Sequence, residues 1–283
     1  MPLPPSTDAG EDAGDPRLGV VKIDTWTLPG DGRAVTIVPT WTPPDAKLPM
    51  LIALHGRGEA MKGPALGVLG WPNDYALLRA IMRLSHPPLT TEDFESFVEP
   101  RRLVEHNDAL AKRTFAGLVI VCPYSPDVDL RKPVRIQEYA DYLLKSVVPR
   151  ARQELPVIDA AGALGIDGVS LGGALALRIG LGNASTFGAV GTLQAAIGQD
   201  QVPELTELAR SARTKNPALK LRLLTSSDDY FKRAIRSASS AWREAGITHD
   251  FEEVPGPHDY PFNRGPGALE MLLWHDRVLS RSA

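Results

Sequence analysis

A serine between two glycines is the first feature of this sequence that could do chemistry. Residues 168–172 read Gly-Val-Ser-Leu-Gly, with Ser170 at the centre. Where a buried strand turns sharply into a helix, the residue at the turn has strained backbone angles, so the residues two before and two after it must lack bulky side chains. Gly168 and Gly172 meet this requirement. The pattern therefore predicts that the hydroxyl of Ser170 is exposed as a nucleophile.

The residues around this pentapeptide decide how much weight it carries, because a chain with 25 glycines can match such a pattern by chance. Residues 160–169 are apolar and small enough for a buried strand, and residues 171–181 have helical spacing. This is the strand, turn and helix that the motif requires. The backbone N–H of Leu171, at the start of the helix, would then point at an oxyanion formed beside Ser170.

A serine hydroxyl is a poor nucleophile until a base accepts its proton, and the base needs an acid to fix its tautomer. In a sheet of this kind the chain order is serine, acid, histidine. Three of the six histidines follow the serine. We expect His249 to open a strand and His275 to lie within the last helix, whereas His258 lies in a loop rich in Gly and Pro. His258 is therefore the predicted base.

The acid has more than one candidate. Asp228 and Asp229 directly follow the apolar run 219–225, which is the expected place for the acid. Neighbouring side chains in an extended loop point in opposite directions, so only one of the two can face His258. Two other aspartates are less well placed: Asp200, after the preceding strand, and Asp167, on the strand that leads to Ser170.

A second glycine-rich loop follows another buried strand. Residues 48–54 are a continuous apolar run that leads into His55-Gly56-Arg57-Gly58-Glu59. Such a loop places backbone N–H groups at the C-terminal edge of the sheet, so it is a candidate for the second half of an oxyanion hole. The side chains of Arg57 and Lys62 could meet an anionic part of a substrate, or they could pair with Glu59 or neighbouring acids.

Strands and helices alternate along most of the chain. Residues 20–28 and 33–41 flank a Pro-Gly-Asp-Gly turn and predict an antiparallel entry to the sheet. The remainder predicts one α/β domain over residues 17–283, with a mostly parallel, doubly wound sheet. Further strands are expected at 48–54, 118–122, 160–169, 187–197, 219–225 and 248–254, and helices at 73–84, 136–154, 171–181, 231–244 and 266–279.

Residues 59–115 are too many for a simple helical crossover between two strands. A helix near 73–84 accounts for part of them. The rest, including the charged segment 92–113, is expected to be an insertion near the active site. It either folds over the site as a cap and shapes the substrate pocket, or it is a surface excursion.

Composition excludes several classes of function. Lys and Arg number 31 against 34 Asp and Glu, and no basic run tracks a phosphate backbone, so nucleic acid is not expected as a partner. No apolar run is long enough to span a bilayer, and no signal peptide opens the chain. The single cysteine, Cys122, excludes an internal disulfide and lies in an apolar run, which predicts a buried thiol.

Residues 1–16 combine Pro, Gly and acidic residues with almost nothing to bury, and they predict a disordered tail. The tail could be native, or it could be a linker left after a signal was removed. As the sequence stands we expect a soluble, cytoplasmic protein, or a secreted one if a leader once preceded the tail.

Three motifs together resemble the α/β-hydrolases, and more narrowly the esterase D-like family of S-formylglutathione hydrolases, feruloyl esterases and enterochelin esterases. They are Leu54-His55-Gly56-Arg57-Gly58, Gly168-Val169-Ser170-Leu171-Gly172-Gly173 and Pro255-Gly256-Pro257-His258-Asp259. The resemblance covers residues 20–279. It implies an acid and a Phe with one residue between them, a spacing that Asp229-Tyr230-Phe231 matches and Asp228 does not. Many relatives have Gly where Ser226 precedes the acids, and the segment 59–115 matches no part of the family pattern.

We therefore expect a serine hydrolase that cleaves a small carboxylic ester without metal or cofactor. Ser170 would attack, His258 would relay the proton, Asp229 would orient His258, and the N–H groups of Leu171 and Arg57 would bind the oxyanion. The same groups could serve a thioesterase or an acyltransferase. The alternative from another class is a hydrolase-fold binding protein that does not catalyse.

Overall fold

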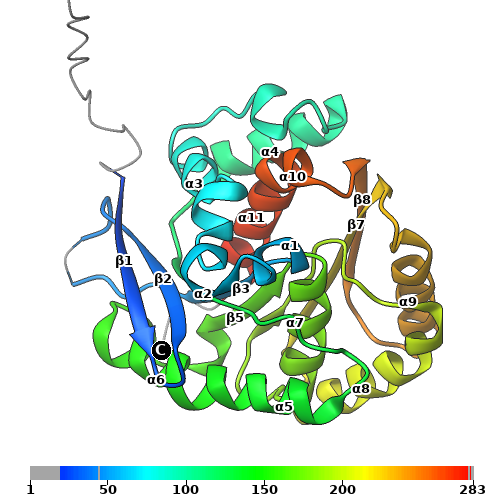
Figure 1. Cartoon of the computed structure of the whole chain (residues 1–283). Helices are drawn as coiled ribbons and strands as arrows, with labels where there is room; N and C mark the ends of the chain where they lie inside the picture. The colour runs from blue at the N-terminus through cyan, green and yellow to red at the C-terminus, as the bar shows by residue number, and fades with distance from the viewer. Residues whose placement is uncertain (1–19, 44, 280, 282–283) are drawn as a thin grey trace, which may run out of the picture.

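A computed structural model describes residues 20–43, 45–279 and 281 of the chain. The predicted tail, residues 1–16, lies outside the described residues. The described chain is built around one sheet in the order β1-β2-β4-β3-β5-β6-β7-β8 (Figure 1). Its strands are β1 (Val21–Leu28), β2 (Gly32–Pro39), β3 (Met50–Leu54), β4 (Val119–Pro123), β5 (Leu164–Gly168), β6 (Ala189–Val190), β7 (Lys220–Asp228) and β8 (Asp250–Pro257).

The direction of the strands follows the sequence expectation. β1 and β2 form an antiparallel hairpin, and β2 pairs antiparallel with β4. From β4 to β8 every neighbouring pair is parallel. The carboxyl ends of these parallel strands therefore share one edge of the sheet, where the loops after β3, β4, β5, β7 and β8 come together.

Helices cover both faces of the sheet, as expected for a doubly wound fold (Figure 1). Along β3, Ile52 and Leu54 pack into one apolar core while Leu51 and Ala53 pack into the other, because successive side chains of a strand point to opposite faces. The first core is covered by α5 (Pro133–Tyr142), α6 (Val148–Glu154), α7 (Leu171–Gly182), α8 (Val202–Lys215) and α9 (Lys232–Glu244), and the second by α3 (Leu77–Ser85), α4 (Pro100–Lys112) and α11 (Ala268–Val278).

Several boundaries differ from the predicted ones. The strand expected over 187–197 is only two residues long, because the chain after β6 turns to meet the loop that carries Ser170. Helix α8 was missed, although Val202, Leu205, Ala209 and Ala212 have the spacing of one buried helical face. Strand β8 extends to Pro257 where a loop was expected from residue 255 onward, so His258 directly follows a strand.

The segment 59–115 is mostly helical. Short helices α1 (Arg57–Ala60) and α2 (Gly63–Gly67) and a π-helical turn (Gly70–Asp74) precede α3. A single 3₁₀ turn (Glu92–Phe94) then leads to α4. Arg102 of α4 donates hydrogen bonds to Glu270 of α11 and Glu252 of β8. The charged part of the insertion thus lies against the C-terminal helix (Figure 1). Its role as a cap stays a prediction.

Candidate active site

Ser170 stands at the turn between β5 and α7 in a strained conformation. Its φ is 57° and its ψ is −116°, a combination that residues with a side chain rarely adopt. A Cβ on Gly168 would lie 2.5 Å from the carbonyl of Gly172, and a Cβ on Gly172 would lie 2.4 Å from the carbonyl oxygen of Leu54. Both glycines are therefore required by close backbone contact, as the sequence predicts.

His258 and Asp229 form a hydrogen-bonded pair at the same edge of the sheet. The Nδ1 of His258 lies 2.8 Å from Asp229 Oδ1, and the two side chains are 15% and 0% exposed. The carboxylate also accepts the hydroxyl of Thr225 at 2.7 Å and the backbone N–H of Phe231 at 3.0 Å. With Nδ1–H donating to Asp229, the Nε2 of His258 is left as the acceptor that a general base needs.

The other candidate acids lie elsewhere. Asp228 is exposed, and its carboxylate accepts only the hydroxyl of Ser227 among the described residues. Asp200 is exposed in the 3₁₀ turn before α8. Asp167 is buried beneath the elbow, where it accepts from Arg222 and His275. Asp229 is thus the carboxylate that the fold places against His258.

Gln194 links the serine loop to the histidine loop. The backbone N–H of Ser170 donates to the carbonyl of Leu193. The side-chain amide of the following residue, Gln194, donates to the carbonyl of Pro257 at 2.8 Å and to Ser226 Oγ at 2.6 Å. The hydroxyl of Ser170 itself has no hydrogen-bond partner within residues 20–43, 45–279 and 281. Contacts between a nucleophile and its base often tighten only when substrate binds.

Two backbone N–H groups at the starts of helices are without an acceptor among the described residues. Leu171 begins α7 and Arg57 begins α1, and neither backbone N–H finds an acceptor in the described part of the chain. The first N–H groups of a helix have no partner within it, so they remain available to a ligand. A Cβ built on Gly56 would lie 3.7 Å from Ser170 Cβ, which places the loop before Arg57 directly against the nucleophile.

His55 holds the candidate oxyanion loop, residues 55–59, in place. Its ring is buried, accepts the N–H of Ser125 at Nε2 and contacts the carbonyl of Gly56 at 3.0 Å through Nδ1. Burial lowers the pKa of His55, so the neutral ring with Nδ1–H fits both partners. His55 thus fastens the loop after β3 to the loop after β4.

The charged side chains near the loop already have partners. Arg57 Nε lies 2.8 Å from Asp127 Oδ1, and Lys62 Nζ lies 2.7 Å from Asp74 and 3.6 Å from Glu59. Both Arg57 and Lys62 are therefore paired with neighbouring acids, which is one of the two possibilities that the sequence raised. The guanidinium of Arg57 lies against Asp127 in the loop after β4, and the role of its backbone N–H stays a prediction.

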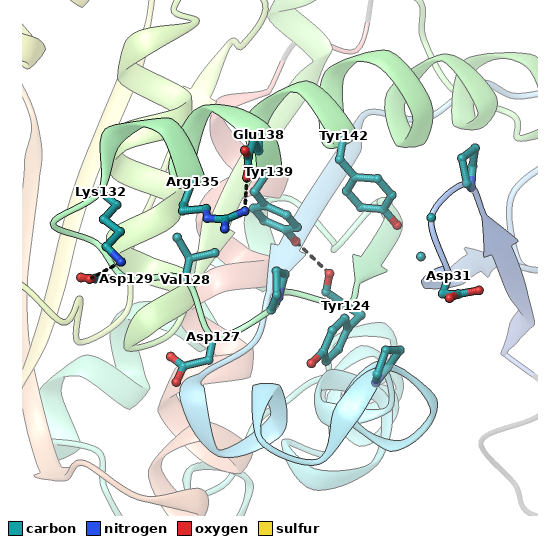
Figure 2. Close-up of a pocket in the computed structure, with 15 residues that line it drawn as sticks. Asp31, Tyr124, Asp127, Val128, Asp129, Lys132, Arg135, Glu138, Tyr139 and Tyr142 are labelled. Atoms are coloured by element: carbon teal, nitrogen blue, oxygen red, sulfur yellow. Dashed lines mark hydrogen bonds and ion pairs between the residues drawn. The ribbon is translucent and has the colours of Figure 1, made fainter.

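A cavity of about 610 Å³ lies beside the oxyanion loop, bounded by the β1–β2 turn, α2, the loop after β4 and α5. Figure 2 shows Tyr139 with its hydroxyl directed at Tyr124, and Tyr142 with its ring toward the β1–β2 turn. Asp127, the partner of Arg57, also lines it, whereas Ser170 and His258 do not. Its tyrosine rings and paired surface charges suit an apolar or aromatic group that carries polar substituents.

Cys122 is not part of the site. It lies in β4 opposite Val35 and is 1% exposed, as predicted for a buried thiol. Burial raises the pKa of this thiol far above its usual range, so no reactive thiolate is available there. Of the described residues, the nucleophile candidate at the sheet edge is Ser170.

Sequence reasoning missed several residues of the site: His55 as a loop anchor, Gln194, Glu59, Tyr75 and Tyr260. A polar residue directly after a buried strand is a signal that could have singled out His55, whereas Gln194 lies four residues beyond the end of β6 and inside the strand that was expected there. Tyr75 has no such signal, because its partner Glu59 is defined only by the folding of the segment between them.

Comparisons with solved structures agree with this architecture. A ferulic acid esterase is 16% identical, with a TM-score of 0.66 over 92% of this chain and 98% of its own. S-formylglutathione hydrolase from Staphylococcus aureus is 16% identical, with a TM-score of 0.61 over 91% and 98%. The enterobactin esterase of Shigella flexneri is 17% identical, with a TM-score of 0.58 over 97% of this chain and 62% of its own.

The chain therefore has the α/β-hydrolase fold, which confirms the expected fold class. Neither a family model nor a curated protein sequence matches the chain. At identities of 16–17% the structural likeness establishes the fold, and the argument for function rests on the site residues. No helix within the described ranges is both long and apolar enough to cross a membrane.

Proposed function

We propose that this protein is a serine hydrolase that cleaves a carboxylic ester through an acyl-enzyme. The observation that carries the proposal is the Asp229–His258 pair at the same sheet edge as the strained Ser170. Each group stands in the order and at the strand end that the fold uses for nucleophile, acid and base. The esterase neighbours support the same reading at the level of architecture.

The geometry supports the following sequence of events. Oγ of Ser170 attacks the ester carbonyl carbon while its proton moves to Nε2 of His258, and the C=O electrons move to the carbonyl oxygen. The N–H groups of Leu171 and Arg57 stabilise that oxyanion. On its collapse His258 returns the proton to the leaving alkoxide, and a water activated by His258 then hydrolyses the acyl-enzyme.

Asp229 stabilises the imidazolium that forms during each proton transfer. Its carboxylate accepts from Thr225 and Phe231 as well as from His258, so it is held in one orientation. A small-molecule carboxylic ester is the substrate class that this arrangement of nucleophile, base and acid supports.

A covalent probe tests this proposal. We expect a fluorophosphonate to add once to the wild-type protein, on the peptide that carries Ser170, and we expect hydrolysis of p-nitrophenyl acetate to be lost in Ser170→Ala. A binding protein without catalysis would show neither result. Labelling on Cys122, or ester turnover that survives Ser170→Ala, would contradict the assignment of the nucleophile.

A further inference from the structure

Glu59 is a buried carboxylate beside the oxyanion loop that the mechanism above does not use. Its side chain is 1% exposed. Removing an ionised carboxylate from water costs several kcal/mol unless hydrogen bonds and a counter-charge replace the water. Glu59 has both: the hydroxyls of Tyr75 and Tyr260 donate to it, the latter at 2.7 Å, and Lys62 Nζ lies 3.6 Å away.

The hydrogen bonds of Tyr75 have a fixed direction. A phenol has one proton, which Tyr75 gives to Glu59, while its oxygen accepts the backbone N–H of Gly56 at 3.1 Å. Burial and the neighbouring carboxylate hold the pKa of Tyr75 well above its usual range, so the phenol stays protonated. The amide of Gly56 is therefore occupied, and the free amide next to it is that of Arg57.

Tyr260 brings the base loop into the same network. It follows His258 by two residues, and its hydroxyl donates to the other oxygen of Glu59. Among the described residues this is the sole hydrogen bond between residues 55–59 and residues 258–262. One carboxylate thus joins the loop that presents an oxyanion donor to the loop that presents the base.

Building on the proposed function, we propose that Glu59 is a positioning residue that sets the oxyanion loop in register with the base loop. Through Tyr75 it fixes the Gly56 amide, and hence the direction of the Arg57 N–H. Through Tyr260 it fixes the chain that follows His258. A displacement of about 1 Å at a reacting centre can cost about 100-fold in rate, so such a connection has kinetic consequences.

Lys62 lies between two carboxylates. Its Nζ is 2.7 Å from Asp74 and 3.6 Å from Glu59, so its positive charge is shared between them. The hydroxyls of Tyr75 and Tyr260 donate to the two different oxygens of Glu59 and replace the water that the carboxylate loses on burial. The buried carboxylate is therefore held by hydrogen bonds to both oxygens and by a shared ammonium.

The test compares Glu59→Gln, Tyr260→Phe and the double variant by ester kinetics and by the rate of fluorophosphonate labelling at Ser170. We expect Glu59→Gln to lower kcat by about 10- to 100-fold with KM changed less than about threefold, because transition-state contacts are lost. Tyr260→Phe alone should cost about tenfold, and in the Glu59→Gln background less than about twofold, because both changes break one connection.

Glu270→Gln is the matched control. Glu270 is also a buried carboxylate, paired with Arg102 and His106, but it lies on α11 away from the catalytic loops. We expect this control to lower the melting temperature and leave kcat and labelling unchanged. If Glu59→Gln behaves in the same way, with stability reduced and kinetics unchanged, Glu59 is merely structural and the proposal is overturned.

Hydrogen exchange separates this proposal from the proposed function. In Tyr260→Phe we expect the amides of residues 56–60 to exchange faster, although the change lies in the other loop. Unchanged exchange there overturns the connection whether or not the protein is an esterase. Failure of the proposed function would show in the wild type itself, as absence of labelling at Ser170.

Discussion

Two aspartate–histidine pairs lie in the described part of the chain, an upper one at the carboxyl edge of the sheet and a lower one beneath the elbow of Ser170. His258 Nδ1 lies 2.8 Å from Asp229, and His275 Nε2 lies 3.0 Å from Asp167. The hydrogen bonds are nearly the same length. The surroundings differ: the side chain of His258 is 15% exposed at the sheet edge, whereas both members of the lower pair are fully buried.

The lower pair is closed on every side. Asp167 also accepts hydrogen bonds from the guanidinium of Arg222 at 3.0 Å and from the N–H of Gly168 at 2.8 Å. Arg222 therefore neutralises its charge, and the bond to Gly168 stabilises the backbone that leads into the elbow. The second nitrogen of His275 faces Gly165, where a Cβ would approach within 2.5 Å. Burial lowers the pKa of His275, so the ring stays neutral.

The difference indicates which of the two pairs could act as a base. The ring must have a second nitrogen that a substrate or nucleophile can reach, and the carboxylate must be free to stabilise a charge on the ring. Asp229 has no cation among its described partners, so an imidazolium at His258 is its natural counter-charge. Asp167 already has that counter-charge in Arg222.

The largest effect is expected at the upper pair. Asp229→Asn should lower kcat by about 10⁴-fold, because His258 would spend much of its time in the wrong tautomer. The exposed neighbour provides the control, since Asp228→Asn should change kcat little. Steady-state kinetics with circular dichroism as a check of folding measures both. A reversal of the two results would move the role to Asp228.

At the lower pair the expected effect is on stability. Asp167→Asn leaves the guanidinium of Arg222 buried without its counter-charge, which should lower the free energy of unfolding by about 3–5 kcal/mol. Turnover of the protein that remains folded should fall far less than in Asp229→Asn. Urea unfolding measures the first quantity. Full stability together with lost activity would mean that the lower pair takes part in catalysis.

The smallest effect concerns pH. Burial lowers the pKa of His275 from its ordinary value of 6.5. Below pH 6.5, His275 therefore binds a proton more readily in the unfolded chain than in the folded one. Stability should therefore be complete above about pH 6.5 and decline as the pH falls, by at most about 2 kcal/mol for this group at pH 5.

His275→Gln tests this assignment. The amide of glutamine can still donate to Asp167 but does not titrate, so the loss of unfolding free energy between pH 7 and pH 5 should be smaller than in the wild type. His55 and His249 also have lowered pKa values and contribute to the slope in the same direction. The same slope in variant and wild type would assign the pH dependence to other groups.

The sequence by itself determined the elements with local causes. The crowding around Ser170 acts within two residues on either side, so the pattern of glycines already specified the elbow. The alternation of apolar runs and helical spacing gave the α/β class and most strands. The elimination among histidines selected His258, because the chain order of the fold restricts where a base can lie.

The tertiary structure decided every pairing between distant residues. Asp229 and His258 are 29 residues apart, and Asp167 and His275 are 108 apart, so neither pair follows from local spacing. Which of two adjacent aspartates faces the base depends on the register of β7 against β8, with its irregularity between Ser226 and Asp228. The buried position of Glu59 depends likewise on tyrosines 16 and 201 residues away, which only the folded chain brings to one carboxylate.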